Sequence, residues 1–574
     1  MHPSTLAKRG TVLLFLVIIA AYFFGLGRLP LLGPDEPRYA EVAREMLMRH
    51  DLVSPTLGGH LWFEKPALLY WMMIASFKVF GVTEWAARLP SAVSGLLTVV
   101  AVFVTGRRVE RVGAPDNELR SYAFWSGLAA ATMIGIAAFS RAASFDILLT
   151  MTTAWTLAFF VLADPDQALA DRSEANPKHR NWFLAGFYTF IGLSLLAKGL
   201  VGIVIPVGVL GSYYLFQRRL PGRKLLTSLI WGLPLTLMVA ATWYLPVMRR
   251  HGWLFIDQFF IQHHFARYIS NKYHHSQPVY YYLLILPLLA LPWTAFLADG
   301  LMQSRSWLRS WLKRPADHQV APAEAQVRQL MILALAWLLF PLLFFSFSNS
   351  KLPGYILPIL PAAALIVGER LVRLYRRSRT ERNSEASDWP IGASAILSLL
   401  FAVAVIVYAS RTAALSVACA AVIAGLLLVG SSFAFVLRRR LTAVALLSFP
   451  ISTAAVLLVA MYSVMPAFAD LDSSKRLLQL ADEHGYSQTA IFGMQRSDRS
   501  PEFYAAARVV YGADGEPIMY EDPEQVVEES RRRGDVLLAF VPVRKVSQLT
   551  GMTSAQTEMI GSNALYALVA VRAR

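Results

Sequence analysis

One polar stretch follows the first long apolar segment of the chain, residues 11–27, and its sequence is Leu32-Gly33-Pro34-Asp35-Glu36-Pro37-Arg38-Tyr39-Ala40-Glu41-Val42-Ala43-Arg44-Glu45-Met46-Leu47. Two adjacent carboxylates, an arginine and a tyrosine fall within five positions of it. Because Pro34 and Pro37 interrupt the backbone, Asp35 and Glu36 are expected in a turn at the start of a helix. A charged turn beside an apolar segment is either a topological anchor or the wall of a site, and the rest of the chain favours a site.

The composition is that of a membrane protein. Of the 574 residues, 56% are hydrophobic and only 16% are charged, whereas soluble domains carry about a quarter charged residues. The first apolar segment has no small-residue cleavage site and many more follow it, so it is not a cleaved signal peptide. The formal net charge of +16 comes largely from arginine clusters in short loops, which orient a protein in a membrane and do not require a nucleic acid partner. The single cysteine, Cys419, excludes an intrachain disulfide and a thiolate metal cluster.

The apolar pattern predicts a mostly α, polytopic membrane protein with about thirteen spanning helices. The predicted spans lie near residues 11–27, 85–106, 121–140, 145–163, 181–197, 199–216, 225–247, 279–299, 328–347, 352–372, 389–409, 413–436 and 442–464. A basic cluster follows every even-numbered span, so those loops and the N-terminus are predicted to be cytoplasmic. The odd-numbered loops and the C-terminus then face outward.

Two outward loops, 28–84 and 248–278, are long. The first contains the apolar segment Ala67 to Phe80, which is too short to cross comfortably and is expected to be interfacial or re-entrant. The second has the pattern of an amphipathic helix. Both are interpreted as juxtamembrane parts of a transmembrane domain spanning 1–465.

After Met465 the composition changes, and polar, alternating segments predict an outward α/β domain over 466–574. Helices are predicted at 473–483, stopped by Gly485, and at 523–533, capped by Asp522 and stopped by Gly534. Strands are predicted at 489–493, 536–541 and 564–571.

Several charged residues are unusual for their predicted positions. Asp35 is either a helix cap or part of a site. Asp146 opens the fourth span, where an acid is costly unless it faces a polar cavity. Cations lie in outward loops or at the outward ends of spans, against the positive-inside rule. They either extend to lipid headgroups or bind an anion such as phosphate; together they favour an anion site, and they are Lys65, Arg141, Lys198 and Lys351.

A metal site is a weaker hypothesis. Glu64, His263 and His264 supply carboxylate and imidazole groups that suit zinc, but their spacing is not a metal signature, and the two histidines also fit an interfacial position. The predicted outward loops before Met465 contain no DxD pair, the usual signature of a metal-bound nucleotide, so a nucleotide-sugar donor is disfavoured. No cofactor is expected to be required, and any bound zinc is expected to be structural or adventitious.

Six short motifs carry a resemblance to a known family: Asp35-Glu36-Pro37-Arg38-Tyr39-Ala40-Glu41, Phe63-Glu64-Lys65-Pro66, Ala87-Arg88-Leu89-Pro90-Ser91, Arg141 with Phe145-Asp146, Ala197-Lys198-Gly199, and Lys351-Leu352-Pro353-Gly354-Tyr355. With them the chain resembles the GT-C class of integral-membrane glycosyltransferases. Within that class it is similar to the bacterial 4-amino-4-deoxy-L-arabinose lipid A transferases, which are related to protein O-mannosyltransferases. Gly354 departs from the pattern, since many relatives carry histidine or another residue there.

The resemblance implies a GT-C fold and transfer of aminoarabinose, with inversion, from undecaprenyl phosphate to a lipid A phosphate at the periplasmic face of a bacterial inner membrane. This modification gives resistance to polymyxin-type cationic peptides. The catalytic candidates are Asp35 and Asp146. The expected donor-phosphate ligands are Lys65, Arg38, Lys198, Lys351 and Arg141. The expected substrate contacts are Glu36, Tyr39, Glu64, Arg267, Tyr268 and Tyr355.

Two other functions compete with this interpretation. A related transferase would act on protein, as an O-mannosyltransferase does, or on another glycan. A transporter or flippase would be expected to show charges in mid-span and related halves, whereas here the charges gather at one face. The expected partners are the lipid-linked donor, the lipid A acceptor and membrane lipids, and the protein is expected to be a monomer.

Overall fold

The structure, a computed structural model, describes most of the chain. The described residues are 16–110, 121–165, 177–266, 277–312, 322–380, 388–411, 416–466, 469, 473–495, 500–505 and 507–574. They form two compact units. The first unit comprises 1–24, 64–69 and 91–460, and the second comprises 25–63, 70–90 and 461–574.

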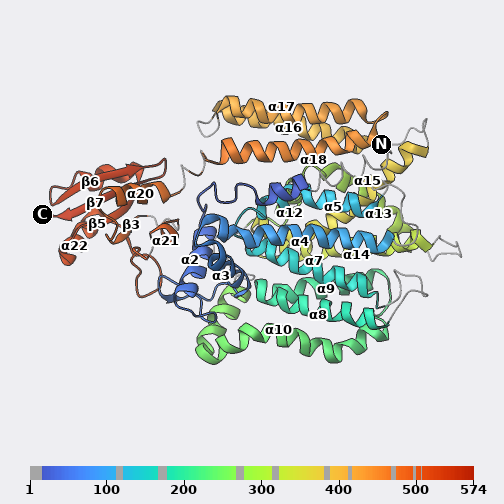
Figure 1. The fold of residues 1–574 in the computed structure, drawn as a ribbon, viewed down its shortest axis with the longest axis horizontal. Coiled ribbons are helices and arrows are strands. Elements are labelled where there is room, and N and C mark those ends of the chain that lie inside the picture. Colours follow the sequence, from blue (N-terminus) through green and yellow to red (C-terminus); the bar gives the residue numbers. More distant parts are fainter. Residues whose placement is uncertain are drawn as a thin grey trace. The chain divides into compact units, whose positions relative to one another are not determined.

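The first unit is a helical bundle in which most long helices run side by side (Figure 1). Its helices are α4 (Glu84–Glu110, which begins in the second unit), α5 (Tyr122–Thr132), α6 (Ile134–Phe139), α7 (Phe145–Ala163), α8 (Pro177–Lys198), α9 (Val201–Phe216), α10 (Arg223–Phe255), η2 (Ile256–Ala266), α12 (Tyr281–Leu289), α13 (Thr294–Leu312), α14 (Pro322–Ser346), η3 (Pro353–Ile359), α15 (Leu360–Thr380), α16 (Trp389–Arg411), α17 (Val417–Leu437) and α18 (Thr442–Val459).

Among the described residues, eight helices are long and apolar enough to cross a membrane, or nine if the bent pair α12 and α13 forms one span. The sequence pattern predicts about thirteen. The first predicted span begins outside the described residues, and α9 has only 16 residues. The predicted span 121–140 is divided into α5 and α6. The polytopic, mostly helical architecture is confirmed.

Two breaks in predicted spans meet inside the bundle. The predicted span 121–140 breaks at Met133, whose ψ of 125° is extended. The predicted span 279–299 bends by 119° between α12 and α13, where Pro292 has no amide hydrogen to continue a helix. The amide of Ile134 donates to the carbonyl of Leu291 at 2.9 Å, so each break supplies a hydrogen-bond partner that the other lacks.

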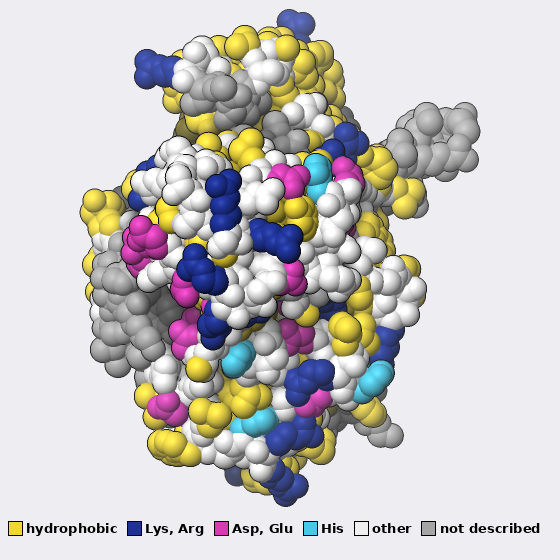
Figure 2. Space-filling view, turned by 90° about the vertical axis from the view of Figure 1, so that its left-hand side faces the viewer, with side chains coloured by type: hydrophobic (Ala, Val, Ile, Leu, Met, Phe, Trp, Pro, Cys, Tyr) yellow, Lys and Arg dark blue, Asp and Glu magenta, His cyan; other side chains and the backbone are white. Residues whose placement is uncertain are grey.

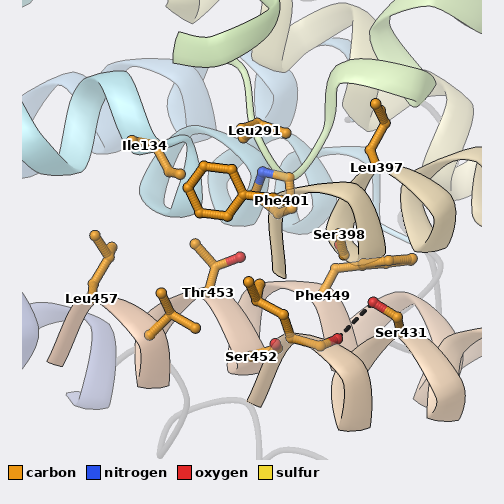
Figure 3. A pocket seen from close by; sticks show the side chains of 13 residues that line it. Ile134, Leu291, Leu397, Ser398, Phe401, Ser431, Phe449, Ser452, Thr453 and Leu457 are labelled. Atoms are coloured by element: carbon orange, nitrogen blue, oxygen red, sulfur yellow. Dashed lines mark hydrogen bonds between the residues drawn. The ribbon is translucent and has the colours of Figure 1, made fainter. Parts of the chain in front are cut away.

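The helices differ in how far they are enclosed. Of the most apolar stretch of Pro353–Ser378, which covers η3 and most of α15, 94% is buried, against 22% for α16. The α16–α18 group is therefore expected to face lipid. Between this group and the bundle lies a cavity of about 50 Å³ (Figure 3). Its lining has hydroxyl groups but no ionisable side chain, and Ser431 donates to the carbonyl of Leu427 in its own helix at 2.6 Å, so this cavity is a packing defect and not a sugar site.

The second unit joins elements of the first long loop to the C-terminal segment. Its helices and strands are α2 (Asp35–Met48), β1 (Thr56–Leu57), β2 (His60–Leu61), α3 (Leu68–Phe80, whose first two residues belong to the first unit), η4 (Ala460–Val464, whose first residue does), α20 (Lys475–Glu483), β3 (Ile491–Met494), α21 (Ser500–Tyr504), β4 (Met519–Tyr520), α22 (Pro523–Arg533), β5 (Leu537–Pro542), η5 (Val543–Lys545), α23 (Val546–Thr550), β6 (Ala555–Ser562) and β7 (Tyr566–Ala573). The single domain boundary after residue 465, which the composition predicts, stays a prediction.

The C-terminal segment forms a five-stranded sheet in the order β4-β3-β5-β7-β6. β3 is parallel to β4 and β5, whereas β7 is antiparallel to β5 and β6. The predicted helix at 523–533 is confirmed as α22, with Asp522 as N-cap and Gly534 in the left-handed conformation (φ 67°) after it. Strands β4 and β6 are additions that the sequence pattern did not predict.

Helix α2 is fixed within the second unit by a buried ion pair. Arg88 donates to both carboxylate oxygens of Glu36, at 2.9 and 2.6 Å, and to the carbonyls of Leu26, Leu29 and Pro30. Both side chains are more than 90% buried. The Glu36 carboxylate also accepts from the amide of Leu32 at 2.9 Å. This arrangement gives Glu36 a structural role, and its predicted contact with substrate stays a prediction.

We expect Arg88→Ala to destabilise the second unit strongly, because it leaves a buried carboxylate without its partner, a loss of about 3–5 kcal/mol. The thermal midpoint of the detergent-solubilised full chain, followed by tryptophan fluorescence, is expected to fall by more than about 5 °C. The control Arg476→Ala removes a surface arginine 3.5 Å from Glu483 and is expected to leave the midpoint nearly unchanged. Equal midpoints for the two variants would contradict the structural role.

The surface in Figure 2 has no continuous basic field among the residues drawn in colour, since lysine, arginine and acidic side chains are interspersed. A protein that binds nucleic acid usually gathers its cations on one face. This face therefore does not have the charge pattern typical of a nucleic acid surface.

Candidate functional site

The first unit holds an ion pair between two predicted site residues, Asp146 and Lys198. Asp146 lies in the first turn of α7, where the helix dipole favours a carboxylate. Ser144 caps this helix by accepting from the amide of Asp146 at 3.1 Å, and the amide of Ser144 donates to Ser91 of α4 at 3.0 Å. These contacts fix the start of α7 and with it the position of the carboxylate.

Lys198 is the last residue of α8 and its Nζ donates to Oδ1 of Asp146. Gly199 follows with φ of 70°, a left-handed conformation that lets α9 begin two residues later. The predicted spans 181–197 and 199–216, which leave a single residue between them, are therefore joined by a tight turn. The Lys198 ammonium also lies 4.7 Å from the centre of the Tyr355 ring, a cation–π contact that holds the lysine from a second side.

Gly354 makes room for this arrangement. A Cβ at this position would overlap Oδ2 of Asp146 and lie 2.8 Å from Cε1 of Phe139. The residue noted as a departure from the family pattern therefore touches the candidate acid directly. Sequence reasoning selected Asp146, Lys198 and Tyr355 separately, and the structure brings the three together.

We expect Gly354→Ala to move the Asp146 carboxylate away from Lys198 and to lower transfer activity by up to about a hundredfold, since a misplacement near 1 Å can have that effect. Activity is measured with membranes containing the variant and lipid-linked donor. The matched control is Gly392→Ala in α16, where a Cβ would meet nothing within 4 Å. Full activity of Gly354→Ala would show that Asp146 does not need its present position.

Three other cations of the first unit are held by their surroundings. Lys65 pairs with its neighbour Glu64 at 2.8 Å, and both are largely buried. Lys351 is buried and donates to the carbonyls of Gln277 and Ser348 at 2.8 and 2.5 Å, and desolvation lowers the pKa of its ammonium. Arg141 donates to the carbonyls of Ala21 and Phe24. These lie at the C-terminal end of a helix whose described part covers residues 16–23, a favourable position for a cation. Lys351 and Arg141 thus have structural contacts whether or not they also bind phosphate.

The second unit holds the remaining candidates at the start of α2. Asp35 is half exposed, with 52% of its side chain accessible, and Arg38 pairs with it. The Arg38 guanidinium lies 5.5 Å from the centre of the Tyr39 ring and 5.2 Å from that of Trp62. Trp62, which sequence reasoning did not select, therefore helps to orient the cation. The predicted helix after the charged turn is confirmed, with Asp35 as its first residue.

The loop 248–278 is helical from residue 248 to residue 266. Helix α10 continues to Phe255 across a kink at Gly252 and is followed by the π-helix η2. Trp243, Phe255 and Phe259 pack together, with ring centres 5.1–5.8 Å apart. Arg267, Tyr268 and the side chain of His264 lie outside the described residues.

No group of three His, Cys, Asp or Glu residues suited to a metal occurs in the part of the chain that the structure describes. Of the three predicted metal ligands, Glu64 pairs with Lys65, His263 lies in η2, and the His264 side chain is not described. The metal hypothesis stays a prediction.

Comparison with known proteins places the chain among glycosyltransferases. Residues 10–305, just over half of the chain, match the family described as dolichyl-phosphate-mannose-protein mannosyltransferase. The chain belongs to this family. It is 32% identical over 376 residues to the undecaprenyl phosphate-alpha-4-amino-4-deoxy-L-arabinose arabinosyl transferase of Pseudomonas aeruginosa strain LESB58, covering 65% of this chain and 61% of the relative. The corresponding protein of Aeromonas hydrophila is 26% identical over 98% of this chain and 99% of its own.

Two solved structures have a fold similar to that of this chain. The crystal structure of ArnT from Cupriavidus metallidurans bound to undecaprenyl phosphate matches with a TM-score of 0.77 and 24% identity, covering 98% of each chain. An oligosaccharyltransferase from Archaeoglobus fulgidus tethered to an acceptor peptide matches with a TM-score of 0.51 and 12% identity, covering 95% of this chain and 70% of that one. The predicted GT-C fold is therefore confirmed, as is the predicted resemblance to the aminoarabinose transferases.

Proposed function

We propose that the protein transfers 4-amino-4-deoxy-L-arabinose from undecaprenyl phosphate to a phosphate of lipid A. The observation that carries this proposal is the Asp146–Lys198 pair over the Tyr355 ring, held at helix ends in a fold like that of ArnT. The names of the relatives supply the sugar and the carrier lipid. A cation can stabilise the leaving phosphate, and a carboxylate can stabilise the cationic sugar.

The chemistry assigns a part to each group. An oxygen of the acceptor forms a bond to the anomeric carbon while the bond from that carbon to the carrier phosphate breaks, and the electron pair goes to the phosphate oxygen. The leaving phosphate gains negative charge, which Lys198, Lys65 and Arg38 are suited to stabilise. An acceptor phosphate is already ionised at neutral pH, so it needs no strong general base. Asp35 and Asp146 would then orient the substrates and stabilise the cationic sugar in the transition state.

The proposed location is the periplasmic face of the inner membrane. The basic clusters after α4, α9 and α15 support a cytoplasmic position for those helix ends. Lys198 is at the C-terminal end of α8, and Asp146 is in the first turn of α7. The opposite ends of these two helices are joined to each other, and the basic residues Lys178 and Arg180 lie at the start of α8. Lys198 and Asp146 are therefore proposed to lie on the periplasmic side. A site there reaches two lipid substrates without removing either from the bilayer.

The experiment that tests this function is mass spectrometry of lipid A from cells with and without the chain. Addition of one or two aminoarabinose groups only when the chain is present is the expected result. A protein acceptor is the alternative to test, because the family description names protein mannosyltransferases. Lipid A and a serine- or threonine-containing peptide are therefore offered side by side to purified protein, and transfer to the peptide alone would reject the lipid acceptor.

We expect chelation to leave the reaction intact. The six family motifs contain no DxD pair, and Glu64, one of the three metal candidates, is engaged by Lys65. Cationic side chains can supply the charge that a metal would supply to a leaving phosphate. Transfer is measured in purified protein after dialysis against EDTA, with and without added Zn²⁺, Mg²⁺ or Mn²⁺. Activity that disappears on dialysis and returns with one of these ions would reject the expectation.

A further inference from the structure

The first unit contains a second, much larger cavity, of about 700 Å³, formed by α8, α9 and α10. Pockets that hold small organic ligands typically have volumes of roughly 300–1,000 Å³. Helix α8 packs against both α9 and α10 and lies between them in Figure 1. Residues of all three helices line the cavity, so α8 forms the floor of a groove and the other two helices form its walls. The groove is separate from the Asp146–Lys198 site, whose residues do not line it.

The walls of the groove are almost entirely apolar, with side chains such as Ile191, Val207, Leu210 and Leu229. Several apolar residues at its edge are open to the surroundings, including Leu215 (71% exposed) and Leu220 (87% exposed). In a membrane protein such an edge lies against acyl chains. The shape and chemistry therefore fit a hydrocarbon tail.

One end of the groove is basic. Arg218 and Arg219 line it there, in the turn between α9 and α10. The Arg219 guanidinium lies over the rings of Tyr213 and Tyr214, 5.9 and 5.8 Å from their centres. Arg223 and Lys224 follow in the first turn of α10, and residues 217–224 include no acid. An apolar groove with a basic end is complementary to a lipid that has an anionic headgroup.

The backbone of Arg218 supports this interpretation. Its φ of 50° lies in the left-handed region, which an arginine adopts only at a conformational cost. The residue comes two positions after the end of α9, where glycine is the usual residue in this conformation. A charged side chain occupies a position for which the backbone alone would favour glycine.

We propose that this groove binds one anionic phospholipid of the cytoplasmic leaflet, with an acyl chain between α9 and α10 and the phosphate beside Arg218 and Arg219. The positive-inside rule places this basic turn on the cytoplasmic side. The site is independent of sugar transfer, because it lies outside the candidate catalytic residues. Its occupant would stabilise the contact between α8, α9 and α10.

Two variants test the two ends of the groove. Gly211 lines the cavity, and a Cβ there would meet nothing within 4 Å, so Gly211→Phe fills the groove without a backbone clash. Its matched control is Gly425→Phe in α17, where a Cβ also meets nothing within 4 Å. Arg218→Gly removes the charge and relieves the left-handed backbone. Its control is Arg439→Ala, an exposed arginine of another basic turn.

The measurement is native mass spectrometry of the purified full chain, released from micelles with added phosphatidylglycerol or phosphatidylcholine. We expect one phosphatidylglycerol to be retained in preference to phosphatidylcholine. Arg218→Gly is expected to weaken its apparent affinity about fivefold without lowering the thermal midpoint, and Gly211→Phe to abolish retention. Both controls are expected to bind as the unaltered chain does.

Three results would overturn the proposal. Equal retention of the two phospholipids would show that the arginines select no headgroup. Unchanged retention in both Gly211→Phe and Arg218→Gly would place any bound lipid elsewhere. Displacement of phosphatidylglycerol by equimolar undecaprenyl phosphate would assign the groove to the donor lipid. Each of these is a binding result, so none depends on whether the protein transfers aminoarabinose.

Discussion

Replacing Asp35 by asparagine is expected to lower transfer to below about a hundredth of its normal rate while the protein still inserts and folds. Asp35 is the first residue of α2, half exposed, and its carboxylate pairs with Arg38. The substitution keeps the shape of the side chain and removes its charge. An acid that stabilises a cationic transition state loses that ability when neutral, whereas a surface acid in the first turn of a helix contributes only about 0.3–1 kcal/mol to stability.

The matched control for this variant is Glu524→Gln, which removes an exposed charge from the first turn of α22. Both proteins are compared for yield, thermal midpoint and the lipid A modification measured by mass spectrometry. Near-normal modification by Asp35→Asn would reduce Asp35 to a helix-start residue. A loss of activity shared by Glu524→Gln would point to a general effect of charge and not to the site.

Replacing Lys198 by alanine is expected to lower transfer by about a hundredfold to a thousandfold, the loss typical when one fixed charge is removed from a transition state. The variant also leaves Asp146 without its ion-pair partner and Tyr355 without the ammonium above its ring. The expected defect lies mainly in the maximal rate, because the leaving phosphate gains charge only as the bond breaks. The rate and the apparent donor affinity are therefore measured separately.

Lys198→Arg is expected to recover part of the rate, since it keeps the charge at the end of α8 but changes its shape. Lys545→Ala in the C-terminal segment serves as the control for a general loss of positive charge. If Lys198→Ala weakened donor binding alone and kept the maximal rate, the lysine would bind the ground state and the transition state equally well. The assignment to the leaving group would then be withdrawn.

The sequence is most informative where structure depends on neighbouring residues. The helix at 523–533 could be predicted to the residue, because a capping aspartate, a proline at the first position and a terminal glycine all lie within the same short segment. The tight turn at Lys198-Gly199 could be predicted for the same reason. The six family motifs made the fold class predictable before any contact was known.

Other features depend on contacts between distant residues. The break at Met133 is satisfied by Leu291, far along the chain, so the pattern of 121–140 alone predicts an uninterrupted span. The sequence predicts that the Glu36 carboxylate contacts substrate, but it does not show that Arg88, 52 positions along the chain, pairs with this carboxylate. Nothing in the spacing of Gly354 and Asp146 indicates that they touch. Apolar runs locate membrane helices well but do not show which of them are broken.

The discontinuous second unit has a consequence for biogenesis. Helix α2 leaves the ribosome early, yet Arg44 in it donates to the carbonyl of Phe503 at 2.9 Å. Nearby, the amide of Leu31 donates to Tyr504 at 2.7 Å. Because synthesis proceeds from the N-terminus, residues 28–84 cannot form these contacts until the C-terminal segment, which follows the helices of the bundle, has been synthesised. Nascent chains therefore pass through a long period in which α2 lacks its native contacts, and reporter fusions that end after α18 capture the protein in that unfinished state.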